Sequence, residues 1–233
     1  MSPSPPRPRA LLFDLDGTLV DSRRDIADAL NAALAAVGRP ELPLATILPM
    51  IGDGARVLVE RALAVDGAAP PDGRAAEATP GASLDEVSAL FLERYAARPV
   101  VHTALLPGAR EALALGLPAA VVTNKPRAIT RLVLERLGVA GSFGAVFAGG
   151  DGPLKPSPHG VRAAAAALGA PVESAWMIGD GPQDVLAGRA AGCFTIAVPG
   201  IAARERVLAA GPHLVVASLH DVARLARASL TSA

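Results

Sequence analysis

The feature that most constrains this chain is an apolar run that ends abruptly in acidic residues. Residues 10–13 are Ala-Leu-Leu-Phe, and Asp14 and Asp16 follow directly, with Gly17 next in the chain. A short apolar run before a Gly-containing turn predicts a buried strand that leads into a loop. Because side chains at i and i+2 of an extended segment point the same way, the two aspartates should face one small volume. Two close carboxylates resist joint ionisation unless a cation or proton lies between them, which indicates chemistry at this strand end. The alternative is a polar strand end that only caps the next helix.

The residues after this segment, up to about residue 104, are expected to be entirely helical. Apolar residues recur at three- and four-residue spacing over residues 22–37, over 56–64 and from Ser83 onward, as in amphipathic helices. Residues 66–82 are rich in Gly, Pro and Ala without periodicity and predict a loop.

Two serines have the spacing of N-terminal capping residues. Ser22 precedes Asp25 by three positions, and Ser83 precedes Glu86 by the same distance. Each pair predicts the start of a helix at which the serine hydroxyl accepts a backbone N–H bond.

After Pro107 the pattern changes to short apolar strands that alternate with helices. Alternation of this kind predicts a parallel sheet with helices on both faces, that is, an α/β fold. We therefore expect a Rossmann-like core domain over residues 1–20 and 105–233, and an inserted all-helical cap domain over residues 21–104. The further strands are expected at 119–122, 145–148, 175–178, 195–198 and 214–216.

The composition excludes several classes of partner. The 233 residues carry 22 Lys+Arg and 22 Asp+Glu, and only 3% are aromatic, so we expect neither nucleic acid nor an acidic membrane surface as a partner.

No apolar run approaches the length that spans a bilayer. The single cysteine, Cys193, fits a reducing compartment, and we expect a cytoplasmic protein. The proline-rich first nine residues predict a disordered lead-in.

Three further polar segments follow predicted strands or loops. Thr123 and Asn124 lie where a strand meets a helix, a position that can hold an anion or simply cap the helix. Lys155 lies in a loop stiffened by prolines, where a lone lysine is otherwise a solvated charge. Asp180 and Asp184 are one helical turn apart and can face the same crevice, where their hard oxygens suit Mg²⁺, although the helix dipole alone also favours acids there.

Together, the four segments resemble, in order and spacing, the four motifs of the haloacid dehalogenase superfamily of phosphohydrolases. The resemblance covers about residues 8–220 and implies Mg²⁺-dependent hydrolysis of a small phosphorylated metabolite. It implies that Asp14 is the nucleophile that forms an aspartyl-phosphate, and that Asp16 protonates the leaving oxygen and then deprotonates water. Mg²⁺ would be held by Asp14, the backbone carbonyl of Asp16 and Asp180, with Asp184 supporting these ligands. The phosphate oxygens would be bound by Thr123, Asn124 and Lys155.

Within the superfamily, Gly52-Asp53-Gly54-Ala55 and Thr123-Asn124-Lys125-Pro126 are most similar to enzymes that act on 2-phosphoglycolate. That substrate ends in a carboxylate, so a cation in the cap is expected, with Arg56 as first candidate and Arg23 as second. The chain departs from the pattern at Gly181, where many relatives have Ser.

Other activities remain open on the sequence alone. Within the class they are a pyrophosphatase, a phosphosugar or nucleotide phosphatase, and less favoured a phosphosugar mutase. From a different class, the chain could be a non-catalytic regulator that binds a phosphorylated ligand. Paired acids at positions 14 and 16 argue against the regulator, because a binder has no need of a nucleophile beside an acid. Oligomeric state is not predicted.

Overall fold

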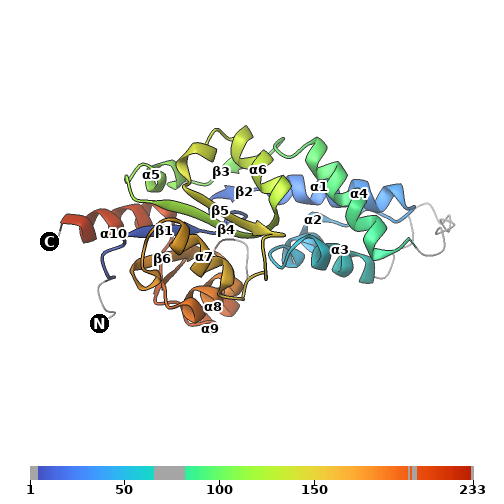
Figure 1. The fold of residues 1–233 in the computed structure, drawn as a ribbon. Helices are drawn as coiled ribbons and strands as arrows, with labels where there is room; N and C mark the ends of the chain where they lie inside the picture. Colours follow the sequence, from blue (N-terminus) through green and yellow to red (C-terminus); the bar gives the residue numbers. More distant parts are fainter. Residues whose placement is uncertain (1–4, 66–81, 199, 201–203, 232–233) are drawn as a thin grey trace.

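The protein contains a six-stranded parallel sheet with helices on both faces, as a computed structural model shows (Figure 1). The structure describes residues 5–65, 82–198, 200 and 204–231. The strand order is β5-β4-β1-β6-β7-β8, so the first strand lies in the middle. The strands of this sheet are β1 (Ala10–Phe13), β4 (Ala119–Pro126), β5 (Ala145–Gly149), β6 (Ala175–Gly179), β7 (Phe194–Ala197) and β8 (Leu214–Val215).

The register brings the carboxyl ends of the central strands together. Phe13, the last residue of β1, pairs with Val121 of β4 on one side and with Ile178 of β6 on the other. The backbone N–H of Asp14 continues this ladder by donating to the carbonyl of Ile178 at 2.9 Å. Residues that follow these three strands therefore converge at one edge of the sheet, as the alternating sequence pattern predicts.

Successive residues of β1 face two separate cores because the side-chain period of a strand is two. Leu11 and Phe13 belong to the cluster packed by α5, α6 and α10, whereas Ala10 and Leu12 belong to the cluster packed by α7 and α8. Figure 1 shows these helix groups on opposite faces of the sheet. The core helices are α5 (Ala109–Leu113), α6 (Arg127–Arg136), α7 (His159–Ala167), α8 (Pro182–Ala191), α9 (Arg204–Ala209) and α10 (Leu219–Thr231), with short 3₁₀ turns η2 (Ala140–Ser142) and η3 (Val172–Ser174).

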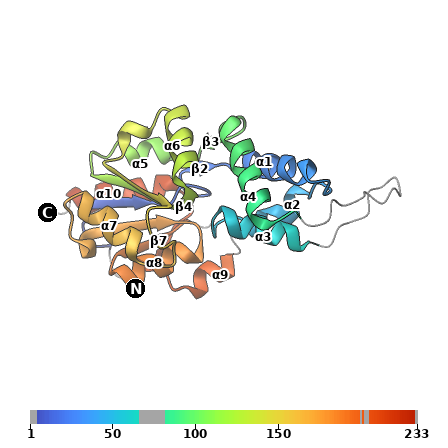
Figure 2. The ribbon, with the colours of Figure 1, turned by 45° about the vertical axis from the view of Figure 1, so that its right-hand side comes forward.

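A second group of helices lies beyond the carboxyl edge of the sheet (Figures 1 and 2). The chain passes into this cap through β2 (Val20–Asp21) and returns through β3 (Ala104–Leu105), and the two strands pair antiparallel as a small ribbon. The predicted α/β fold with an inserted helical cap is thus confirmed. The expected loop at residues 66–82 lies, except for Ala82, outside the described residues. The cap consists of α1 (Arg23–Ala36), α2 (Leu44–Ile47), η1 (Leu48–Met50), α3 (Ala55–Ala64) and α4 (Leu84–Ala97).

The two predicted serine caps have different outcomes. Ser83 caps α4, since its hydroxyl accepts the backbone N–H of Glu86 at 3.2 Å. Ser22 precedes α1 but makes no side-chain capping bond, so that prediction was wrong. Its hydroxyl instead donates to Asp16, because the loop after β1 brings that carboxylate within reach.

The expectation of a disordered lead-in is also wrong for its described part. The carbonyl of Pro6 accepts a bond from the indole N–H of Trp176 at 2.9 Å, and the N–H of Arg9 donates to Ser174. A buried Trp with a polar N–H needs such a partner, which the sequence pattern did not reveal.

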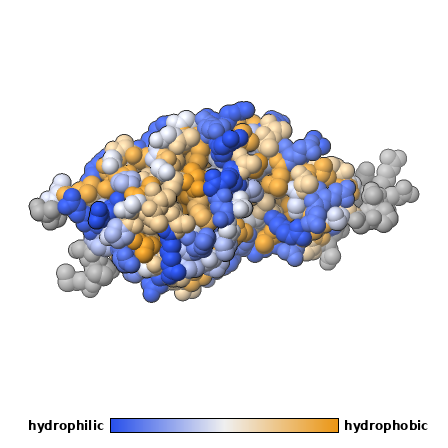
Figure 3. Space-filling model, viewed as in Figure 1, coloured by the Kyte–Doolittle hydropathy of each residue, from blue (hydrophilic) through white to orange (hydrophobic). Residues whose placement is uncertain are grey.

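The surface mixes polar and apolar residues on the face drawn in Figure 3. Among the described residues, the large apolar side chains that are exposed lie in separate parts of the chain, for example Leu44 in the cap and Leu186 in α8. In the part of the chain that the structure describes, no helix combines the length and apolar character needed to cross a membrane.

Candidate active site

The first strand delivers Asp14 into a buried position at the carboxyl edge of the sheet. Its carboxylate oxygen Oδ1 accepts a bond from Lys155 Nζ at 2.6 Å. The same ammonium donates to Asp184 Oδ1 at 2.6 Å and to the carbonyl of Val122 at 2.7 Å. All three N–H donors of this lysine are therefore used, and Lys155 bridges residues that lie far apart in the sequence.

Three aspartates, Asp14, Asp180 and Asp184, form a buried cluster that could hold a metal ion. Each offers a carboxylate oxygen, and these oxygens lie within 4.8 Å of one another. Asp184 is fixed by the backbone N–H of Gly181, which donates to its Oδ2 at 2.9 Å. Asp180 Oδ1 accepts a bond from the hydroxyl of Thr18 at 3.3 Å.

The charge balance of the cluster fits a divalent cation. Burial, against the opposing charge of Lys155 and with smaller contributions from Asp184 and Asp16, raises the pKa of Asp14 to about 7. Of the described groups, the cluster brings together three carboxylates and the one ammonium of Lys155, and oxygen ligands are those that Mg²⁺ prefers. An acidic cluster able to hold a metal is thus present, as predicted.

The Asp16 carboxylate contacts Lys125, a residue to which the sequence analysis gave no role. Lys125 Nζ lies 2.9 Å from Asp16 Oδ1 and 3.1 Å from Oδ2, and it donates to the hydroxyl of Tyr95 at 2.6 Å. Burial alone lowers the pKa of Lys125, but Asp16 and Tyr95 reverse this and raise it above its usual range. Burial also raises the pKa of Tyr95 to about 12. Lys125 follows Thr123 and Asn124 directly, so its place in that motif was the available signal.

Thr123 and Asn124 both lie at the site, in different ways. Thr123 lines a cavity with Asp14 and Asp16, and its hydroxyl accepts the backbone N–H of Lys125 at 3.2 Å. Asn124 uses its amide to tie the loop to the cap, because Nδ2 donates to the carbonyl of Gly52 at 3.1 Å. It also exchanges bonds with the backbone of Lys155, at 2.8 and 3.0 Å.

Two cavities lie between the cap and the carboxyl edge of the sheet. One of about 50 Å³ is lined by Asp14, Asp16 and Lys125 below and by apolar cap residues such as Leu58 and Phe91. The other, of about 240 Å³, is lined by Asp16, by residues 180–183, by cap residues 48, 49 and 51–53, and by Arg206 of α9. Figure 2 shows α9 on the side of the core that faces the cap. Sequence reasoning missed Arg206, since an exposed arginine on a short helix has no distinguishing pattern.

The two arginines expected to bind the substrate both form ion pairs with neighbouring aspartates. Arg56 forms an exposed ion pair with Asp85 within the cap, and Arg23 pairs with Asp21. Neither arginine is among the residues that line the two cavities. Their proposed contact with a substrate therefore gains no support from these positions.

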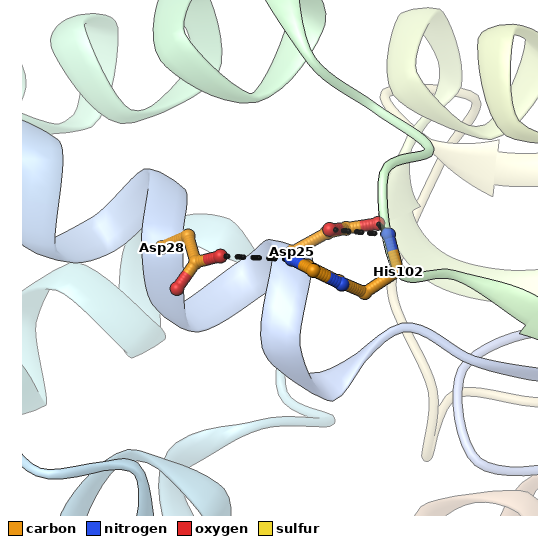
Figure 4. Close-up of side chains that lie close together, drawn as sticks. All are labelled: Asp25, Asp28 and His102. Carbon is orange, nitrogen blue, oxygen red and sulfur yellow. Dashed lines mark hydrogen bonds and ion pairs between the residues drawn. The ribbon is translucent and has the colours of Figure 1, made fainter.

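Asp25 anchors the return from the cap to the core (Figure 4). Its carboxylate accepts the backbone N–H groups of residues 101–103 at 2.8 to 3.1 Å, and also the hydroxyl of Thr103 at 2.6 Å. Figure 4 shows the His102 ring turned toward Asp28, 3.9 Å away. Burial by itself would raise the pKa of Asp25, but these hydrogen bonds outweigh it and lower the pKa. These hydrogen bonds fix the first turn of α1 to residues 101–103, the linker through which the chain returns from the cap to the core.

Comparison with known proteins agrees with this geometry. A family model described as haloacid dehalogenase-like hydrolase matches residues 8–192. A phosphoglycolate phosphatase of Rhodospirillum rubrum is 39% identical over 88% of this chain and 85% of its own. One of Caulobacter vibrioides is 37% identical over 95% of this chain and 92% of its own. The crystal structure of a predicted phosphoglycolate phosphatase from Haemophilus somnus superposes with a TM-score of 0.80 at 26% identity, over 94% of this chain and 98% of that one.

The chain belongs to the haloacid dehalogenase-like hydrolases. The predicted enzyme class, a phosphoric monoester hydrolase, is likewise confirmed.

Proposed function

We propose that this enzyme hydrolyses 2-phosphoglycolate to glycolate and phosphate, with Mg²⁺ as cofactor and an aspartyl-phosphate as intermediate. The observation that carries the proposal is the meeting of Asp14, Asp16 and the Asp180–Asp184 pair beneath a helical cap. Relatives that cover most of this chain are phosphoglycolate phosphatases, which supports the choice of substrate. The same proposal includes the domain boundaries at residues 21 and 104, which lie within the β2–β3 ribbon, and a cytoplasmic location.

The residues divide the reaction into two halves. In the first, an oxygen of Asp14 forms a bond to phosphorus while the bond to the glycolate oxygen breaks, and Asp16 gives that oxygen its proton. In the second, Asp16 takes a proton from water, whose oxygen attacks the phosphorus and returns Asp14 as a free carboxylate. Lys155 and Thr123 would neutralise and orient the phosphate oxygens, which is the main demand of phosphoryl transfer.

Asp14, Asp180 and the backbone carbonyl of Asp16 would hold Mg²⁺, and Asp184 would orient these ligands through Lys155 and Gly181. When bound, the ion neutralises charge on the phosphate and the carboxylates. The buried cluster supports this assignment because its carboxylates outnumber the nearby ammonium.

Arg206 is our candidate for the group that recognises the substrate carboxylate. It lines the larger cavity, whose other walls include Asp16 and Asp180, so an arginine fork there can reach an anion near the site. This candidate replaces Arg56 and Arg23, each of which already has a carboxylate partner outside the two cavities.

The test is phosphate release from a panel of esters. Purified protein is incubated with Mg²⁺ and 2-phosphoglycolate, pyrophosphate, hexose phosphates or nucleoside monophosphates, with chelator and Asp14→Asn as controls. We expect the highest kcat/KM for 2-phosphoglycolate and no turnover with Asp14→Asn or chelator. A higher kcat/KM for another ester would reject the substrate while keeping the mechanism. No release from any ester would reject the catalytic proposal.

A further inference from the structure

We propose that Lys125 is a positioning residue for Asp16 and that Tyr95 of the cap holds Lys125 in place. The inference rests on the proposed function of Asp16 as proton donor and acceptor. It assigns a role to a buried ammonium that the mechanism above does not use, and it links that role to a cap residue.

The first argument is the geometry of the ion pair. Lys125 Nζ contacts both oxygens of Asp16, at 2.9 and 3.1 Å, and therefore restrains the plane of the carboxylate as well as its position. The hydroxyl of Ser22 also donates to Oδ1. Asp16 thus accepts hydrogen bonds from two side chains, whereas Asp14 accepts one from Lys155. The two aspartates at positions 14 and 16 therefore contact different lysines.

The second argument is burial. The side chain of Lys125 is 3% exposed and that of Asp16 is 14% exposed. In the described part of the chain, Asp16 is the one carboxylate within ion-pair distance of Lys125. A buried charge without a counter-charge is strongly unfavourable, so each of the two groups confines the other.

The third argument is the contact across the cap. Tyr95 belongs to α4, and its hydroxyl accepts the third N–H of Lys125 at 2.6 Å. The ammonium also lies 4.4 Å from the centre of the Tyr95 ring. The cation–π contact and the hydrogen bond between Lys125 and Tyr95 both require α4 to lie near the core. The position of the cap therefore bears on the position of Asp16 through one lysine.

The kinetic test compares two leaving groups. Because kcat/KM reports aspartyl-phosphate formation, it depends on proton delivery for an alkyl ester and much less for 4-nitrophenyl phosphate, whose phenolate leaves without a proton. Lys125→Met should lower kcat/KM for 2-phosphoglycolate by about 100-fold, the range of general acid catalysis, and for the aryl ester by less than about tenfold. Tyr95→Phe, which keeps the ring, should show the same selectivity with a smaller loss. Arg131→Met, in an exposed ion pair with Glu135, is the control and should change neither value.

Equal losses on both esters in Lys125→Met would overturn the proposal, because a general structural defect does not distinguish leaving groups. If another alkyl ester proves to be the substrate, it takes the place of 2-phosphoglycolate in the comparison. A variant that also carries Asp16→Asn should lose little beyond Asp16→Asn alone, since the lysine acts through the aspartate.

A second measurement does not depend on activity. In thermal unfolding, Lys125→Met and Asp16→Asn each leave a partner unpaired, so the double variant should have a Tm at least roughly 3 °C above the additive value. If the wild-type protein releases no phosphate at all, the proposed function fails, and this cycle alone decides whether Lys125 holds Asp16. Additive losses in Tm would then reject the pairing.

Discussion

Adding a methyl group at Gly17 should damage the active site in addition to straining the backbone. Its φ is +86°, and a Cβ at this position would lie 2.2 Å from Asp180 Oδ2, against an ordinary contact that begins at 3.4 Å. Gly17→Ala therefore forces the Asp180 carboxylate, or the loop, to move by about 1 Å, and displacements of this size cost about 100-fold in rate. Gly38 is a matched control, because its φ is +72° and its Cβ would meet nothing within 4 Å.

In both variants the left-handed backbone should lower the free energy of unfolding by about 1–2 kcal/mol, which corresponds to a loss of several degrees in Tm. Only Gly17→Ala should also lose about 100-fold in kcat/KM and need more Mg²⁺ for half-maximal activity. The assays are calorimetry for Tm, phosphate release over a range of ester concentrations for kcat/KM, and phosphate release at saturating ester while Mg²⁺ is varied. Wild-type kcat/KM and an unchanged Mg²⁺ requirement in Gly17→Ala would refute the contact with Asp180 and its role.

Two further predictions concern the linker and the larger cavity. Asp25→Ala leaves the N–H groups of residues 101–103 and the Thr103 hydroxyl without their acceptor. The free energy of unfolding, measured in urea, should therefore fall by at least about 2 kcal/mol. The exposed control Asp28→Ala should lower the free energy of unfolding by less than about 0.5 kcal/mol. Equal effects would contradict the anchor. Arg206→Ala should raise KM for 2-phosphoglycolate about tenfold and leave KM for ethyl phosphate, which has no carboxylate, unchanged. Arg204→Ala is the control on the same helix, and equal effects on both esters would remove Arg206 from substrate recognition.

The Asp25 anchor also has a pH dependence of known sign. Because hydrogen bonds lower the pKa of Asp25 in the folded protein, the carboxylate stabilises the fold fully above its unfolded pKa, about 3.9. The contribution decreases as the pH falls from there through the folded pKa. The stability difference between wild type and Asp25→Asn should therefore be constant near neutral pH and shrink below about pH 4. A difference that grows on acidification would contradict this assignment.

Much of the fold and of the core site follows from local sequence pattern. Short apolar runs in alternation with amphipathic segments predict parallel strands, and parallel strands bring their carboxyl ends to one edge. That argument alone predicts that Asp14, Asp180 and Thr123 lie together. The register of β1 with β4 and β6 in the structure brings these residues to the same edge of the sheet. The pattern is reliable here because burial on both faces of a central strand leaves little choice of residue type.

Only the tertiary structure decided which partners the polar side chains meet across the chain. Lys125 and Asp16 are 109 positions apart, and Asp25 meets a linker 76 to 78 positions away. The spacing of Ser22 and Asp25 predicted a helix cap, yet the Asp25 carboxylate instead accepts backbone N–H groups of residues 101–103. Hydrophobic periodicity records which face of an element is buried, but it carries no information about the distant group that a buried charge requires. That partner is set by how the cap lies against the core.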